Sequence, residues 1–305
     1  MCPLGNSCAC ESSCFTVRLV FLPHPDLTVG VPTAPPQLNI ELLTSFAPRP
    51  KATHVVFDFD GTLSWVRHGW PEMMQTVMGP RFPLQANETA EDIREHLFNE
   101  MYRFNGQPTP LFMSEMARQI SERGGTADPD ELLTAFITPL DEMANERHRQ
   151  LRTGETPPDD LIVHGGRALL EHLHTRGLKT LILSGNPHPQ ISQEAELLDL
   201  TRYCNGRVQG HVHAENFSKQ DVLEQWMAED GFTGENLIMF GDGAAEIKAT
   251  ANLGGLSIGV CSDEAVNGSG VVDQSKRDIL LPAGADAIIA DYRDPELLTQ
   301  TVLGQ

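Results

Sequence analysis

The sequence predicts an α/β protein, in which a parallel sheet is interrupted after its first strand by a helical segment. Three observations lead to this fold class. Short apolar runs alternate with amphipathic helical patterns from about residue 160 onward, which is typical of a parallel sheet covered on both faces. One more short apolar run, at 54–59, stands alone. Roughly 95 residues of purely helical periodicity then separate this run from the others.

Composition and charge indicate a globular protein that does not bind polyanions. The chain has 305 residues, of which 40% are hydrophobic and 21% charged, as in ordinary globular domains. Its formal net charge of −20 argues against binding to nucleic acid or to an anionic membrane surface. No apolar run reaches the roughly 18 residues of a membrane span, so we expect no membrane association. An anionic substrate would require local positive charge, which a bound cation can supply.

Residues 1–50 are expected to form a poorly ordered N-terminal extension, because their many prolines oppose regular packing. Four of the six cysteines fall there, at Cys2, Cys8, Cys10 and Cys14, in no standard zinc-binding spacing. The start of the chain lacks the basic and apolar regions of a signal peptide. We therefore expect a reduced, cytoplasmic protein. The expected domains are a core at 51–66 and 160–305, and a helical cap at 67–159.

The alternation of patterns gives the expected elements in chain order. Helices are expected at 71–78, 88–104, 110–125, 128–154, 165–177, 189–200, 219–231, 244–254 and 295–304. Strands are expected at 54–59, 179–185, 206–212, 236–243, 256–260 and 285–292.

Polar side chains stand where these strands end. In open α/β sheets, ligands bind beyond the carboxyl ends of the strands. The residues expected at or just after the carboxyl ends of these strands are Asp58, Asp60, Ser184, Gly185, Asn186, Lys219, Asp242 and Glu246. We therefore expect them to share one site.

These residue types favour phosphoryl chemistry at a metal centre. Aspartates bind Mg²⁺, which prefers oxygen ligands, while Ser184 and Lys219 can hold phosphoryl oxygens. One aspartate can then attack phosphorus, and the cations offset the repulsion between nucleophile and phosphate. Asp60 is near enough to Asp58 to protonate the leaving oxygen. Taken alone, "HVVFDFDGTLS" is also compatible with an ordinary Asp-Gly turn.

Four motifs resemble those of the haloacid dehalogenase-like (HAD) superfamily. "VVFDFDGTLS" is similar to the first motif, Ser184 in "LILSG" to the second, Lys219 to the third and "IMFGDGAAE" to the fourth. The resemblance implies a Rossmann-like parallel sheet of order 3-2-1-4-5. It also implies a helical cap inserted directly after the first motif, as in relatives of phosphoglycolate phosphatase and β-phosphoglucomutase.

The resemblance also implies roles for individual residues. Asp58 would be the nucleophile and a Mg²⁺ ligand, and Asp60 the acid/base, with its backbone carbonyl also reaching the metal. Asp242 would be another metal ligand, and Glu246 stands where many members carry a second acidic residue. The substrate's phosphoryl group would be held by Ser184, Gly185, Asn186 and Lys219.

Arg67 is a further candidate, because it follows the nucleophile closely in sequence. A guanidinium there can hold an anionic group of the substrate through two hydrogen bonds.

The function expected is a Mg²⁺-dependent phosphatase that hydrolyses a small phosphorylated metabolite through an aspartyl-phosphate. Superfamily dehalogenases and phosphonatases lack an aspartate equivalent to Asp60, so its presence favours an oxygen leaving group. A phosphomutase of the same superfamily and a non-catalytic module that binds a phosphorylated ligand are the alternatives.

Overall fold

A single mixed sheet forms the centre of the part of the chain that the computed structural model describes, residues 38–305. The expected extension over residues 1–37, with its four cysteines, lies outside the described residues. Strand order is β1-β7-β6-β5-β2-β3-β4. The strands are β1 (Ile40–Leu42), β2 (His54–Phe57), β3 (Lys179–Pro187), β4 (Val208–His211), β5 (Leu237–Gly241), β6 (Leu256–Val260) and β7 (Ala287–Ile289).

Strands β2 to β7 run parallel, so the predicted fold class is confirmed. The predicted order 3-2-1-4-5 corresponds to β4-β3-β2-β5-β6. Strand β2 lies between β3 and β5, and Phe57 pairs with Ile182 on one side and Phe240 on the other. This register brings the ends of three strands to the same level at one edge of the sheet.

The first described residues depart from the sequence-based expectation. Residues up to 50 were assigned to the extension, but β1 pairs antiparallel with β7 at the edge of the sheet. Arg277 holds this strand through two hydrogen bonds to Glu41, at 2.8 and 2.6 Å. Three residues are too few to show a periodicity that marks a strand, which is why the sequence alone did not place it.

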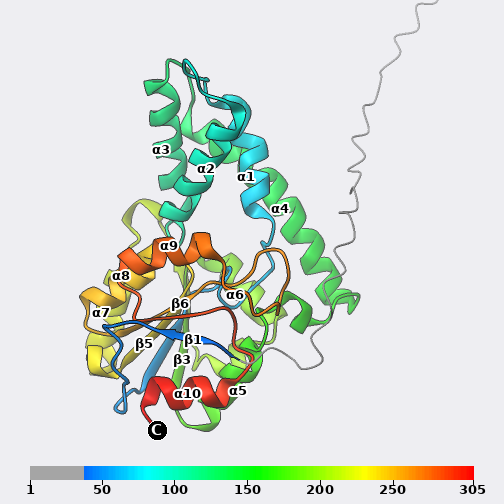
Figure 1. Ribbon diagram of the computed structural model, residues 1–305. Coiled ribbons are helices and arrows are strands. Elements are labelled where there is room, and N and C mark those ends of the chain that lie inside the picture. The colour runs from blue at the N-terminus through cyan, green and yellow to red at the C-terminus, as the bar shows by residue number, and fades with distance from the viewer. Residues whose placement is uncertain (1–37) are drawn as a thin grey trace, which may run out of the picture. The chain divides into compact units, whose positions relative to one another are not determined.

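Helices cover both faces of the sheet because every second side chain of a strand points to the same face. On one face, Val55 and Phe57 pack in a cluster with residues of α5, α6 and α10. On the other face, Val56 packs with residues of α7 and α8, and α9 contacts α8 (Figure 1). These helices are α5 (Gly166–Thr175), α6 (His188–Leu197), α7 (Lys219–Asp230), α8 (Ala244–Asn252), α9 (Gln274–Ala283) and α10 (Pro295–Leu303).

Four helices between β2 and β3 pack around an apolar cluster of their own. They are α1 (Trp70–Met78), α2 (Ala90–Phe104), α3 (Thr109–Glu122) and α4 (Pro129–Thr153). We call residues 67–159, which carry them, the cap segment (Figure 1). Thr89 and Asp92 form a capping box at the start of α2, and the Asp128 carboxylate caps α4. Within residues 38–305, no helix is both long and apolar enough to cross a membrane.

Helix α9 was not predicted from the sequence. Its segment contains Pro282, which normally opposes helix continuation, and it follows a loop rich in glycine and polar residues. The structure nevertheless forms the helix, with the Asp273 carboxylate accepting hydrogen bonds from the backbone of Ser275 and Lys276. This helix carries Lys276 to the edge of the sheet where the candidate site lies.

Tyr292 fastens the loop after β2 to the loop after β7. It is fully buried, its ring packs edge-on against Phe57 and Phe240, and its hydroxyl donates to the carbonyl of Thr62 at 3.0 Å. We predict that Tyr292→Phe lowers the free energy of unfolding by about 1–2 kcal/mol, because the Thr62 carbonyl loses its partner in a buried setting. Denaturant unfolding measures the change.

The control is Tyr203→Phe, at a second buried tyrosine. Among the described residues, its hydroxyl makes no hydrogen bond, so this change is expected to cost less than about 0.5 kcal/mol. Equal decreases in the free energy of unfolding for the two variants would show that the Tyr292 hydrogen bond does not stabilise the fold.

Candidate active site

The loop after β2 carries Asp58 and Asp60 and turns back sharply at Gly61. The backbone N–H of Asp58 donates to the carbonyl of Phe240 at 2.9 Å, which continues the pairing with β5. Gly61 has φ of 70°, and a Cβ there would lie 2.1 Å from Oδ2 of Asp242. A side chain at position 61 would therefore collide with Asp242, so glycine lets the two loops meet.

Three carboxylates converge at this edge of the sheet. Oxygens of Asp58, Asp242 and Glu246 all lie within 4.8 Å of one another, and all three residues are buried. Asp58 follows β2, Asp242 follows β5 and Glu246 lies in the first turn of α8. Glu246 is held in place because its carboxylate accepts a 2.5 Å hydrogen bond from the backbone N–H of Gly243.

Lys219, the first residue of α7, bridges two of these carboxylates. Its ammonium donates to Asp58 at 2.6 Å and to Glu246 at 2.8 Å. Burial raises the pKa of Asp58 well above its usual range, with Lys219 opposing, and burial raises the pKa of Glu246 as well. Burial lowers the pKa of Lys219, but the two carboxylates more than offset this and raise it overall. Lys219 therefore stays charged and stabilises the cluster.

The donor set fits a hard divalent cation. The three carboxylates offer oxygen ligands of the kind that Mg²⁺ prefers. Three negative charges this close together repel one another, and the ammonium groups of Lys219 and Lys276 offer two positive charges between them. A cation held by Asp58, Asp242 and Glu246 would supply the remaining positive charge.

Lys276 of α9 is a further charged residue at the site, and the sequence analysis missed it. It is fully buried, and its ammonium lies 3.2 Å from Asp242, 2.5 Å from Glu264 and 3.0 Å from the hydroxyl of Ser262. That hydroxyl in turn donates to the carbonyl of Gly61 at 2.7 Å. Lys276 thus ties the Asp242 loop to the loop after β2. No local motif marks it, because its partners lie in the loops after β5 and β6.

Asp60 lies beside the cluster and has its own partners. Asn186 donates to its carboxylate at 2.5 Å, and Arg67 at 3.4 Å. Burial raises the pKa of Asp60 to about 6, with Arg67 opposing the shift. A carboxyl with a pKa near 6 can exchange a proton close to neutral pH, as a general acid and base must.

Arg67, which we expected from the sequence to hold an anionic group of the substrate, contacts carboxylates of the protein itself. Its guanidinium donates to the fully buried carboxylate of Glu194 at 2.6 Å, besides its bond to Asp60. His148 of α4 lies 3.1 Å from the other oxygen of Glu194. Glu194 stands 127 residues after Arg67, which explains why sequence spacing could not reveal the pairing. The charge of Arg67 is already compensated within the protein.

Ser184, Gly185 and Asn186 lie together in the last part of β3, on the far side of Asp58 from β5. The Ser184 hydroxyl accepts a 3.1 Å hydrogen bond from the backbone N–H of Asn186. The structure therefore brings all the site residues expected from strand ends to one edge of the sheet.

A loop of the cap segment reaches this edge, and the sequence analysis did not identify it. The side-chain amide of Asn105 donates to the carbonyl of Asp242 at 3.1 Å, and its oxygen accepts from the N–H of Gly106 at 3.0 Å. Gly106 has φ of 84°, and a Cβ there would lie 2.2 Å from Oε2 of Glu246. The Asn-Gly pair between two helical patterns is a turn signal, but it does not show what the turn contacts.

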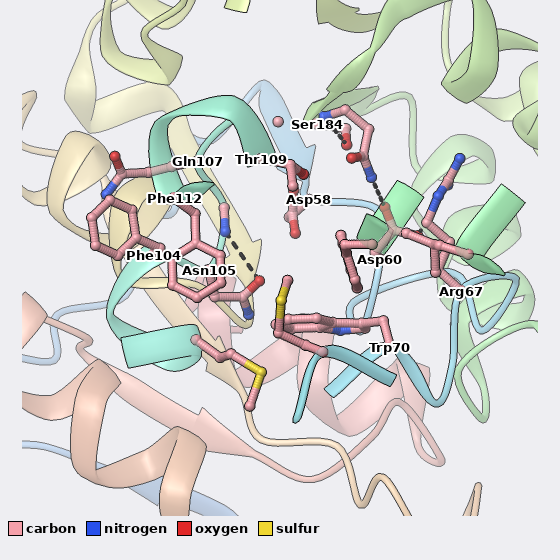
Figure 2. Close-up of a pocket in the computed structure, with 17 residues that line it drawn as sticks. Asp58, Asp60, Arg67, Trp70, Phe104, Asn105, Gln107, Thr109, Phe112 and Ser184 are labelled. Carbon is pink, nitrogen blue, oxygen red and sulfur yellow. Dashed lines mark hydrogen bonds and ion pairs between the residues drawn. The ribbon is translucent and has the colours of Figure 1, made fainter. Parts of the chain in front are cut away.

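A pocket opens between this edge and the cap segment. Asp58, Asp60, Ser184, Gly185 and Asn186 line it from the sheet side. Figure 2 shows Asp58 pointing into the pocket, with Phe104 and Phe112 to one side of it and Asp60 and Arg67 to the other. A ligand in the pocket would therefore contact Asp58 directly.

We predict that Gly106→Ala destabilises the protein by about 3 kcal/mol, as measured by denaturant unfolding. A left-handed backbone costs a residue with a side chain about 1–2 kcal/mol, and the collision with Glu246 adds to this cost. The matched control is Gly124→Ala, since Gly124 has φ of 85° and a Cβ there would meet no other described atom within 4 Å. Gly124→Ala should lower the free energy of unfolding only by the cost of the left-handed backbone. Equal decreases for the two variants would contradict the contact between the Asn105–Gly106 loop and Glu246.

Comparison with known proteins shows likeness to phosphatases and to their fold. The chain is 29% identical over 190 residues to a phosphoserine phosphatase of Lactococcus lactis subsp. lactis (strain IL1403), which covers 56% of this chain and 88% of that protein. A haloacid dehalogenase-like protein of unknown function from Agrobacterium tumefaciens str. C58 matches with a TM-score of 0.55 and 16% identity, over 81% of this chain and 97% of that one.

An HAD family hydrolase from Deinococcus radiodurans R1 matches with a TM-score of 0.53 and 16% identity, over 83% of this chain and 98% of that one. At such identities the two solved structures show the fold alone. The model of the haloacid dehalogenase-like hydrolase family matches residues 52–254, a span that contains Asp58, Ser184, Lys219 and Asp242. The chain therefore belongs to the haloacid dehalogenase-like hydrolase family.

Proposed function

We propose that this hydrolase is a Mg²⁺-dependent phosphatase, which cleaves the phosphomonoester of a small metabolite through an aspartyl-phosphate on Asp58. One observation supports this above all. The buried carboxylate of Asp58 lines a pocket, 2.6 Å from the Lys219 ammonium and within 4.8 Å of two further carboxylates. A candidate nucleophile, a buried ammonium group and carboxylates suited to bind a metal ion thus lie next to one another. The likeness to a phosphoserine phosphatase agrees with this chemistry.

In the first step, a carboxylate oxygen of Asp58 attacks phosphorus, and the bond from phosphorus to the alcohol oxygen breaks. The ammonium of Lys219 and the hydroxyl of Ser184 hold phosphoryl oxygens and stabilise their charge. Asp60 gives its proton to the departing oxygen, for which its pKa of about 6 is suited. The alcohol then leaves from the pocket side.

In the second step, water attacks the phosphorus of the aspartyl-phosphate. Asp60, now ionised, takes a proton from this water. The bond from phosphorus to Asp58 breaks, and inorganic phosphate and the free carboxylate are restored. Asn186 and Arg67 keep the Asp60 carboxylate oriented in both steps through the hydrogen bonds described above.

Asp58, Asp242 and Glu246, with the backbone carbonyl of Asp60, would hold the Mg²⁺. When bound, the ion neutralises charge on the phosphoryl group and on the attacking carboxylate. Asn105 and Lys276 position Asp242 for this task, one through its carbonyl and the other through its carboxylate.

We predict that Asp58→Asn lowers phosphate release from a panel of phosphomonoesters by about 10⁴-fold or more, because the amide is not a nucleophile. The matched control is Asp278→Asn on the exposed face of α9, which should retain normal activity. Stoichiometric release of inorganic phosphate would also exclude a pure phosphomutase. Activity that survives in Asp58→Asn would refute the assignment of the nucleophile.

Metal removal provides an independent test. We predict that chelation abolishes hydrolysis and that added Mg²⁺ restores it. We also expect Mg²⁺ to raise the unfolding temperature, since a ligand at 100 times its dissociation constant stabilises a protein by about 2.7 kcal/mol. This rise should vanish in Asp242→Asn and persist in Asp278→Asn. Full activity after complete chelation would contradict a role for the metal.

A further inference from the structure

The pocket above Asp58 has two chemically different parts. Its sheet side carries the phosphoryl-binding groups described above, and its cap side is built by α1 to α4. A phosphate ester bound with its phosphorus at Asp58 must place its alcohol portion against the cap side. The cap side therefore determines which alcohols fit.

The cap side is predominantly apolar. Its walls are formed by Trp70, Met74, Met101, Phe104, Phe112 and Phe136. All four cap helices contribute to these walls, and Figure 2 shows the Trp70 ring facing the space in front of Asp58 and Asp60. Sulfur and aromatic side chains of this kind favour apolar ligands, including flat rings.

The pocket offers no free charge to the alcohol portion. Among its described lining residues, Arg67 is the one cation, and its charge is shared between Glu194 and Asp60. The carboxylates present are Asp58 and Asp60, of which the first binds the phosphoryl group and the second handles the proton. A carboxylate or ammonium group on the alcohol portion would lose its water without gaining a partner, which is costly.

The polar residues on the cap side are uncharged, and one of them, Asn105, already has partners in the protein. Its amide group donates to the Asp242 carbonyl and its oxygen accepts from Gly106. Gln107 and Thr109 also line the pocket; their side chains can offer hydrogen bonds but carry no charge to pair with a carboxylate or an ammonium.

We propose that the substrate is the phosphate monoester of an uncharged, largely apolar alcohol. This inference rests on the proposed phosphatase function and narrows it to a substrate class. It also separates this protein from a phosphoserine phosphatase, because O-phosphoserine carries both an ammonium and a carboxylate on its alcohol portion.

The test compares two esters that differ at one distant group. 4-Methylbenzyl phosphate and 4-carboxybenzyl phosphate have similar size, and both release a primary benzylic alcohol. We expect kcat/KM to be about 100-fold higher for the methyl compound, since the pocket has no partner for the carboxylate. O-Phosphoserine, assayed alongside, should be hydrolysed no better than the carboxy compound.

A charge-introducing variant tests whether the cap wall causes this preference. Phe104 is only partly buried, so Phe104→Lys is expected to be tolerated. It should raise the ratio of 4-carboxybenzyl to 4-methylbenzyl turnover by at least about tenfold, because the ammonium provides the missing partner. Leu84→Lys, at an exposed leucine of the cap segment, is the matched control and should leave the ratio unchanged.

Binding without turnover gives a second readout that does not depend on Phe104→Lys folding. Benzylphosphonate has no cleavable ester oxygen, and calorimetry on the Mg²⁺-loaded wild-type protein should show it binding at least about tenfold tighter than methylphosphonate. Equal affinities for the two phosphonates would overturn the proposal.

The other outcomes separate this proposal from the proposed function. If the wild-type protein hydrolyses 4-carboxybenzyl phosphate or O-phosphoserine as well as the methyl compound, the substrate class is wrong and the phosphatase function stands. If it hydrolyses no phosphomonoester under conditions where Mg²⁺ stabilises it, the proposed function fails, and the substrate class fails with it.

Discussion

The structure depends on the burial of three carboxylates within 4.8 Å of one another. Such a cluster is unstable unless positive charge is fixed around it. Lys219 and Lys276 provide that charge from two different helices. Lys219 contacts Asp58 and Glu246, and Lys276 contacts Asp242. The parallel pairing of β2 with β5 is what brings these loops together. The fold thus holds the carboxylates and lysines in an arrangement of buried charges that would be unfavourable for either set alone.

Much of this could be predicted from the sequence because the relevant signals are local. Asp58, Asp242 and Lys219 each stand at a strand end or helix start that periodicity locates, and parallel strands bring such ends together. Lys276 and Glu194 could not be found in this way. Both lie within helices, and their importance comes from partners on other elements, Asp242 for Lys276 and Arg67 for Glu194. Arg67 lines the pocket, but its pairing with Glu194 depends on tertiary packing and could not be predicted from spacing.

The cap segment illustrates a second limit of sequence reasoning. Its helices follow from apolar spacing, yet the spacing does not show which apolar side chains fill the interior and which face the pocket. Met113 and Met116 are fully buried in the cap cluster, while Met74 and Met101 belong to that cluster and also line the pocket. The proposed reaction chemistry and the proposed substrate preference therefore depend on different parts of the chain, and only the first is marked by a sequence motif.

The central claim is that Asp58 becomes phosphorylated during turnover. Borohydride reduces an acyl phosphate to an alcohol, so acid-quenched protein treated in this way and digested should yield homoserine in place of Asp58. We expect this product when a hydrolysed ester and Mg²⁺ were both present, and not when either was omitted. Turnover without any conversion at position 58, or with conversion at another carboxylate, would contradict the account.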